Sequence, residues 1–166
     1  MEQGNQAAIT QALNAIAIAI QNQNILMGNV PVKFKVWTSG GGTLTASADT
    51  KILFDTEDYD TGNNFDIAND RFVAPYAGWY QFDCAVHVSA SASGHNVQLR
   101  KNGSIVWIGQ ELQNLSGTSG LAGTCTLFLQ AGDYIELYAY NGSGGAKTYL
   151  GTAFRTYLSG MIKAVQ

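Results

Sequence analysis

From residue 32 to the end, the sequence is a series of short apolar, β-branched and aromatic runs separated by clusters of Gly, Asn, Ser and Asp. This rhythm is typical of an all-β sandwich or barrel, because the clusters favour tight turns and the runs suit a pleated sheet. A turn is predicted at 131–133, and another at 101–103, where Asn-Gly favours a tight hairpin. Strands are predicted at 32–37, 51–54, 78–88, 97–100, 104–108, 125–130, 134–141 and 156–164.

Residues 5–27 have a different character, since they are rich in Ala, Ile, Gln and Asn and contain neither Pro nor Gly. The Ala-Ile alternation at 15–20 resembles a strand, but the Ala, Gln and Leu content favours a helix. Apolar side chains recur at alternating spacings of four and three, with Gln23 completing the series, as in the a/d stripe of a coiled coil. The stripe consists of Ile9, Leu13, Ile16, Ile20 and Met27.

This helix has two interpretations. It is either an amphipathic helix folded onto its own domain, or a coiled coil joining several chains, with Gln6 and Gln23 as polar layers that fix the register. The sequence Gly-Asn-Val-Pro at 28–31 predicts a helix end and a hinge. We therefore expect a helix in 1–29 that joins chains or attaches the protein to a larger body, and a β domain in 30–166.

Charge and hydropathy exclude several classes of function. Charged residues make up only 13% of the chain, and its nine Lys and Arg are scattered, so it has no basic cluster for nucleic acid. The apolar stretch at 7–20 contains Gln11 and Asn14 and is too short to span a bilayer. The start of the sequence lacks the basic region and cleavage pattern of a signal peptide. We expect neither nucleic-acid binding, nor membrane insertion, nor export by the general route.

Five segments of the β region resemble, in the right order, motifs of the C1q globular-head family, which is related to tumour necrosis factor. They are RFVAP at 71–75, GWYQF at 78–82, VQLRKNG at 97–103, LFLQAGDYIEL at 127–137 and YLSGMI at 157–162. The resemblance covers about residues 32–166 and implies a ten-stranded jelly roll that assembles as a compact trimer. The chain lacks the collagen Gly-x-y stalk of the family, so the role in complement is not carried over.

Alternation along the strands predicts an outward-facing set of aromatic side chains. If Tyr80, Phe82, Ile135 and Leu137 fill the core, their neighbours point the other way, unless a bulge reverses one strand. The resemblance implies that the strands bearing this set neighbour each other in one sheet that faces the trimer axis. Aromatic residues suit such an interface. The predicted interface consists of Trp79, Phe128, Tyr134, Tyr138 and Tyr140.

The sequence offers no recognisable catalytic or cofactor-binding motif, so we expect a non-enzymatic protein without a cofactor. Cys84 and His87 are three apart in a predicted strand and face opposite sides, so they do not form a nucleophile–base pair. Cys84 and Cys125 are expected to pack inertly on the core faces of their strands, with a disulfide as the alternative if those strands are adjacent. His87 and His95 are expected at the surface or in hairpins.

One acidic segment, 49–70, holds seven of the twelve acidic residues. Oxygen-rich loops can bind calcium, and the resemblance allows it, because some C1q-like heads do so. Asp58 and Asp60 are the candidate ligands, although Gly62 stands one position early for an EF-hand loop and the closing Glu is missing. The alternative is a solvated acidic loop.

Three functions are weighed from these features. The first is a homotrimeric virion protein, a bacteriophage fibre tip or capsid decoration that is docked to the particle through its helix. The head loops 89–95, 112–123 and 141–151 would then contact a host surface protein or glycan. The second is a secreted, extracellular C1q-like binding module, cytokine-like or carbohydrate-binding, whose leader has been removed. The third is an enzyme that uses a metal in the acidic segment.

Overall fold

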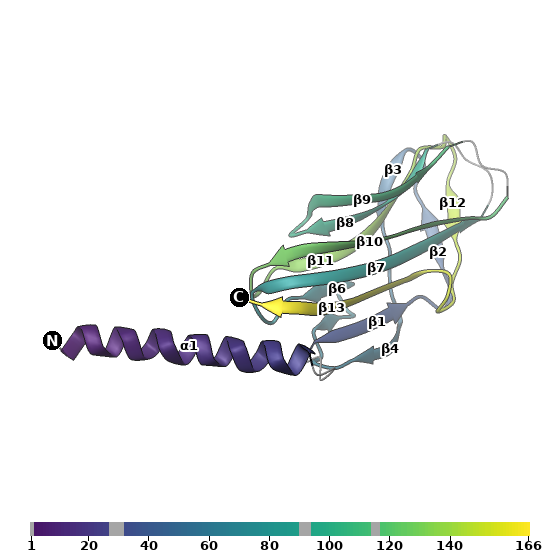
Figure 1. The fold of residues 1–166 in the computed structure, drawn as a ribbon. Coiled ribbons are helices and arrows are strands. Elements are labelled where there is room, and N and C mark those ends of the chain that lie inside the picture. Colours follow the sequence, from purple (N-terminus) through teal and green to yellow (C-terminus); the bar gives the residue numbers. More distant parts are fainter. Residues whose placement is uncertain (1, 27–31, 90–93, 114–116) are drawn as a thin grey trace.

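The protein consists of one N-terminal helix followed by a β-sandwich head (Figure 1). This computed structural model describes residues 2–26, 32–89, 94–113 and 117–166. The helix α1 spans Glu2–Leu26. The strands are β1 Lys33–Trp37, β2 Gly42–Leu44, β3 Ala48–Lys51, β4 Thr56–Asp60, β5 Phe65–Asp66, β6 Arg71–Val73, β7 Gly78–Ser89, β8 His95–Lys101, β9 Ser104–Leu112, β10 Ser119–Leu129, β11 Tyr134–Asn141, β12 Lys147–Tyr149 and β13 Tyr157–Val165.

The strands of the described residues form two antiparallel sheets that pack face to face (Figure 1). The first sheet has the order β2-β12-β7-β13-β1-β4. Its seventh strand, β10, is hydrogen-bonded to β7. The second has the order β5-β6-β11-β8-β9, and β3 pairs with β11. The predicted all-β, C1q-like jelly roll behind a short N-terminal helix is therefore confirmed.

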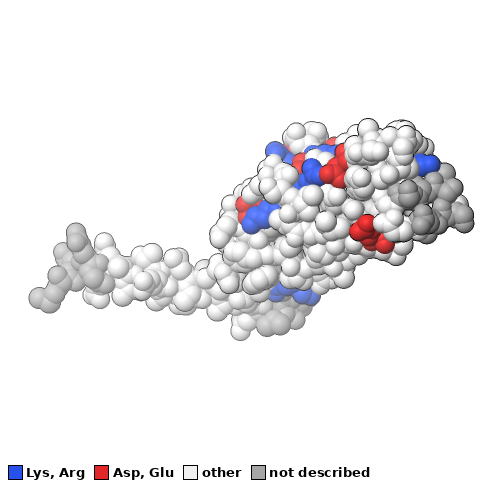
Figure 2. Space-filling model, turned by 90° about the horizontal axis from the view of Figure 1, so that it is seen from above, with Lys and Arg blue, Asp and Glu red and all other residues white. Residues whose placement is uncertain are grey.

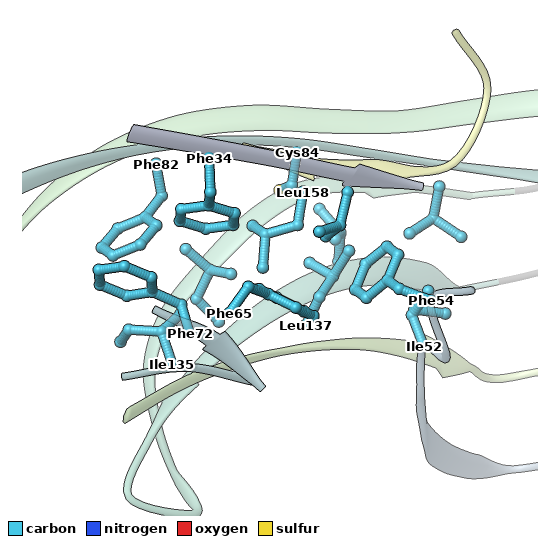
Figure 3. Packing of buried hydrophobic residues seen from close by; sticks show 14 of the residues in the cluster. Phe34, Ile52, Phe54, Phe65, Phe72, Phe82, Cys84, Ile135, Leu137 and Leu158 are labelled. Carbon is cyan, nitrogen blue, oxygen red and sulfur yellow. The ribbon is translucent and has the colours of Figure 1, made fainter. Parts of the chain in front are cut away.

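The core lies between the two sheets, and β7 shows how alternation builds it. Every second side chain of this strand, from Tyr80 to Val88, is buried, which confirms the predicted core face. In Figure 3, Phe34 and Phe82 of one sheet face Phe72 of the other, and the rings of Phe34 and Phe72 stack with centroids 4.7 Å apart. Burial of each such ring contributes about 1.5–3 kcal/mol to stability.

Two predicted turns are confirmed and are tied together. Asn102 and Gly103 both have positive φ, 51° and 81°, as a tight hairpin between β8 and β9 requires. The Asn102 side chain donates to Asp133 Oδ1 at 2.7 Å and accepts from the backbone N–H of Tyr134 at 2.9 Å. The β8–β9 turn is thereby fixed to the β10–β11 turn.

The acidic segment contains short strands that sequence periodicity misses. Segment 49–70 holds β4 and β5, and part of β3, instead of forming one solvated loop. The strand predicted at 51–54 is wrong for its last three residues, because β3 ends at Lys51. Beyond it, the N–H of Phe54 donates to the Asp70 carboxylate at 2.6 Å instead of continuing the sheet.

The helix α1 is confirmed and extends away from the head (Figure 1). Only its C-terminal part contacts the head: Ile18 packs against the core cluster, and Asn22 Oδ1 accepts the backbone N–H of Val165 at 3.2 Å. The interpretation of α1 as an amphipathic helix folded onto its own domain is wrong, because the apolar stripe is not buried against the head. Ile9, Leu13, Ile16 and Ile20 are 54–60% exposed.

Three further sequence expectations concern this region. Met27 and the predicted helix end at 28–31 lie outside the described residues. Joining of several chains through the stripe stays a prediction. Within the described part of the chain, no helix combines the length and apolarity needed to cross a membrane.

Candidate interaction surfaces

The five aromatic residues predicted to form one interface lie on two different sheets. Trp79 in β7 and Phe128 in β10 belong to the first sheet, whereas Tyr134, Tyr138 and Tyr140 in β11 belong to the second. The prediction that their strands share one sheet is wrong. The physical reason is that the turn between β10 and β11, closed by the hydrogen bond from Asp133 N to Gln130 O, carries the chain from one sheet to the other.

Trp79 and Phe128 form an aromatic pair on the outer side of the first sheet. They are directly opposite each other in the β7–β10 register, and their rings meet edge to face with centroids 5.5 Å apart. Trp79 remains 44% exposed. Lys101 from the neighbouring hairpin donates to the Phe128 carbonyl at 3.3 Å and pairs with Asp133 at 2.6 Å. This pair is the part of the predicted set that the fold brings together.

Two of the three tyrosines on β11 are covered by arginines of the same chain. The Arg100 guanidinium lies 4.0 Å from the ring centroid of Tyr138, and the Arg71 guanidinium lies 5.0 Å from that of Tyr134. Asp49 holds Arg100 in place through an ion pair with Nη2. A role of these tyrosines in a trimer stays a prediction, but their faces already have intramolecular partners.

Strand β9 adds an apolar surface that the sequence patterns missed. It is the edge strand of the second sheet, and Ile105, Val106 and Ile108 are 47%, 40% and 52% exposed. An exposed apolar edge strand is a template for association. The sequence patterns missed this surface because alternation only tells which side chains share a face of the sheet. It does not tell which strand lies at the edge, where successive side chains can be exposed.

The stripe of α1 is a second apolar surface, and it carries no charge. No charged residue occurs between Glu2 and Lys33, and the described part of the helix is uniformly white in Figure 2. The visible face of the head also carries only scattered charges (Figure 2). Ionic contacts therefore contribute little to whatever covers the stripe.

The two calcium candidates both lie on β4, Asp60 as its last residue, and both already have hydrogen-bond donors. Asp58 Oδ2 pairs with Lys35 Nζ at 2.5 Å and Oδ1 accepts from the Trp37 indole at 2.9 Å. The hydrogen bond from Lys35 lowers the pKa of Asp58, with Trp37 contributing. Asp60 accepts the backbone N–H groups of Gly62 and Phe65. Among the described residues, no three His, Cys, Asp or Glu side chains gather to hold a metal.

The two cysteines lie on the adjacent strands β7 and β10, the arrangement under which a disulfide was the alternative prediction. Their thiols are nevertheless free. Cys84 is buried opposite Gly123, and Cys125 is partly buried opposite Phe82. Burial raises the pKa of Cys84 to about 12 and that of Cys125 to about 11. Protonated, packed thiols are poor nucleophiles, so this arrangement provides no reactive cysteine.

The histidines lie apart from each other. His87 is partly buried on the outer side of β7. The surface position expected for His95 is wrong, since this residue is 1% exposed. The reason is that β8 lies between β11 and β9, so His95 is paired on both sides, opposite Asn141 and Leu112.

The described part of the head has at least two cavities. One, of about 530 Å³, is lined by the turn residues Asn63 and Asn64 together with Ile67 and Pro75. The other, of about 340 Å³, is lined by Thr38, Leu53, Asp55 and Tyr149 among others. Both are within the size range of small-ligand sites.

The fold and the sequence together show to which protein family the chain belongs. The sequence profile of the C1q domain matches residues 34–160, and the chain belongs to the C1q domain family. The fold resembles the globular domain of zebrafish complement 1qA, with a TM-score of 0.61, 16% identity, and coverage of 82% of this chain and 99% of that one. It also resembles murine APRIL, with a TM-score of 0.59, 12% identity, and coverage of 79% and 98%.

The similar curated proteins are longer than this chain. YqcC of Bacillus subtilis is 30% identical over 124 residues, which are 68% of this chain and 33% of YqcC. The phage-like element PBSX protein XkdV of the same organism is 26% identical over 123 residues, 68% of this chain and 18% of XkdV. Human adipolin is 30% identical over 115 residues, 60% of this chain and 38% of adipolin. The chain therefore spans less than two fifths of each relative.

Proposed function

We propose that this chain is a non-enzymatic, homotrimeric structural or adhesive protein of a virus particle, a capsid decoration or fibre tip of a bacteriophage. The observation that carries the proposal is the helix α1, which has no charged residue after Glu2 and leaves the C1q-like head with Ile9, Leu13, Ile16 and Ile20 more than half exposed. Such a stripe is unstable in water unless other chains cover it.

Two apolar surfaces at the same end of the head support the trimer. Trp79 is paired with Ala164 in the β7–β13 register, next to Val165, whose N–H is bound by Asn22 of α1. The Trp79–Phe128 pair is therefore close to the point where the helix contacts the head. One assembly can bury both the stripe and this pair, and a trimer is what the C1q resemblance implies.

The particle assignment rests on the relatives and on the division of the chain into two parts. XkdV belongs by name to a phage-like element. In the proposed arrangement the helices attach the trimer to the particle, and the head projects toward the host surface. Head loops on a rigid sandwich then make the host contact.

The test combines mass and location. Light scattering of the full chain should give three times 17.7 kDa. An antibody raised against the head should detect the chain in particles purified by density gradient from the host that carries the gene. A monomer in solution, or a chain missing from purified particles, contradicts the proposal.

A secreted binding module is the second candidate, and the similarity to human adipolin favours it. On this alternative the same trimer would be found in the culture medium, free of particles. The gradient fractions of the same experiment therefore separate the two candidates.

A further inference from the structure

We propose that the cluster of Lys51, Asp70 and Glu136 is an acid-responsive clamp, which takes up one proton in mildly acidic solution and thereby stabilises the head. The cluster lies on the second sheet, where the end of β3 pairs with β11 and contacts the turn that precedes β6. The clamp is a property of the single chain. It therefore goes beyond the proposed function and applies equally to a particle protein and to a secreted module.

Three carboxylates meet only two cations at this place. Glu136 pairs with Lys51 at 2.6 Å, and Asp66 pairs with Arg71 at 3.2 Å. Asp70 is the carboxylate left over, since in the described parts of the chain no lysine or arginine forms an ion pair with it. Glu136 is only 8% exposed, so water screens this place poorly. An unbalanced negative charge is unfavourable there.

The backbone holds the Asp70 carboxylate in the cluster. Asp70 has φ of 47°, a left-handed conformation that Asp adopts more readily than most other residues. Its Oδ1 accepts the backbone N–H of Phe54 at 2.6 Å, and the carbonyl of the preceding residue, Asn69, accepts Lys51 Nζ at 2.6 Å. Phe54 is buried, so the carboxylate cannot turn toward water without leaving a buried N–H group unpaired.

The surroundings of Asp70 favour its protonated form. Burial is the largest cause and raises the pKa of Asp70 above 3.8. The N–H of Phe54 and the charge of Lys51 oppose this shift, whereas the charges of Asp66 and Glu136 add to it. A raised folded-state pKa means that proton uptake stabilises the folded chain. This stabilisation is fully present below pH 3.8 and is lost as the pH rises through the raised value.

Two further titratable groups lie near the cluster, and neither supplies a positive charge. Burial raises the pKa of Tyr149 in β12, and the charge of Asp70 contributes, so the phenol stays neutral while Asp70 titrates. The carboxylate of Asp55 accepts the backbone N–H and the hydroxyl of Ser39, at 2.8 and 2.7 Å. A proton on Asp70 is therefore the simplest way to balance the cluster.

The clamp acts on a segment that belongs to the core. Ile52 and Phe54, which follow Lys51, are 0% and 4% exposed, and Figure 3 shows both among the core side chains. The Ile52 N–H donates to the Leu137 carbonyl of β11 at 2.9 Å. Lys51 and Phe54 also line the cavity of about 340 Å³. Proton uptake by the clamp should therefore stabilise this wall of the cavity together with the core.

The experiment compares the thermal unfolding of the full chain with that of Asp70→Asn, at about pH 4.5 and about pH 7.5. Asn removes the charge, keeps an oxygen that can accept the Phe54 N–H, and tolerates the positive φ. We expect the melting temperature of the unchanged chain to fall relative to that of Asp70→Asn as the pH rises. The difference between the two proteins is the readout, because the other groups titrate in both.

Asp58→Asn is the matched control. The hydrogen bond from Lys35 lowers the pKa of Asp58, so the stabilisation by this carboxylate is constant above pH 3.8. Its difference from the unchanged chain should be the same at both pH values. Lys51→Met removes the cation of the clamp and should make the loss at the higher pH larger.

Three results overturn the proposal. They are a difference between the unchanged chain and Asp70→Asn that does not change with pH, a change of the opposite sign, and an equal change in Asp58→Asn. Oligomeric mass and particle location do not enter the comparison. Failure of the clamp and failure of the proposed function are therefore told apart.

Discussion

Asn22 in the helix and Val165 in the last strand, 143 positions apart, are joined by a hydrogen bond of 3.2 Å from the Val165 backbone N–H to the Asn22 side chain. This contact fixes the C-terminal part of α1 against β13. The direction in which the helix leaves the head is therefore set by the protein itself. The path of the stripe and its distance from Trp79 depend on this contact, and in the proposed particle the spacing of the heads would depend on it as well.

Replacing Asn22 by Ala should loosen the helix without unfolding the head. The lost hydrogen bond is worth about 0.5–1.5 kcal/mol. Hydrogen–deuterium exchange at the Val165 amide should become faster, while amides of β7 keep their protection. Asn14→Ala is the control, since Asn14 is exposed on the same helix, and unchanged exchange at Val165 in both variants would contradict the contact.

If the stripe joins chains as proposed, a charge placed in it should dissociate the helices. Ile16 is 56% exposed in the single chain, so Ile16→Glu costs the monomer little but would place an unpaired carboxylate in the seam of an oligomer. We expect a lower mass by light scattering, with the circular dichroism of the head preserved. Gln11→Glu, at an exposed helix position outside the stripe, should leave the mass unchanged.

Gly123 is required by Trp107. A Cβ at this position would lie 2.4 Å from the Cη2 atom of Trp107, so the indole would have to leave its place between β9 and β10. Gly123→Ala should lower the free energy of unfolding by about 1–3 kcal/mol, as overpacking typically does. Gly144→Ala is the matched control, because a Cβ there meets nothing within 4 Å, and urea unfolding of both variants measures the difference.

The Lys35–Asp58 pair should appear in the acid titration of the head. The pKa of Asp58 is lowered from 3.8, chiefly by the hydrogen bond from Lys35. A lowered folded-state pKa means that the stabilisation is fully present above pH 3.8 and is lost as the pH falls through the depressed value. An NMR titration of the Asp58 carboxyl carbon should show a midpoint below 3.8, and Lys35→Met should raise it.

Both thiols should be inert in the folded protein. With pKa values raised to about 12 and 11, Cys84 and Cys125 are almost wholly protonated at about pH 8, where thiol reagents need the thiolate. A thiol-reactive dye should label neither residue until urea unfolds the chain. Rapid labelling of the native protein at Cys125, the more accessible of the two, would contradict this.

The sequence was most informative where one strand or turn carries its own pattern. The alternation of Tyr80 to Val88 predicts the buried face of β7, and Asn102-Gly103 predicts the hairpin, because both depend on neighbouring residues alone. Strands of two or three residues, such as β5 and β12, show no period and were missed.

Features set by the arrangement of strands could not be read in this way. The separation of Trp79 from Tyr138 depends on which sheet receives β11, and the exposure of Ile105 and Ile108 depends on β9 being an edge strand. Phe154, which is 72% exposed between β12 and β13, gives no signal of this exposure in the sequence, since a single aromatic residue in a turn is as compatible with burial as with exposure.

The position of β13 determines when the head can form during synthesis. This last strand lies in the interior of its sheet, hydrogen-bonded to β7 on one side and to β1 on the other. Residues 33–37 can pair with β4 early, but they wait for residues 157–165 to leave the ribosome before their other edge gains its partner. Until then β1 and β7 lack the strand that joins them, so the first sheet closes only after nearly the whole head has been synthesised, and not progressively from its N-terminus.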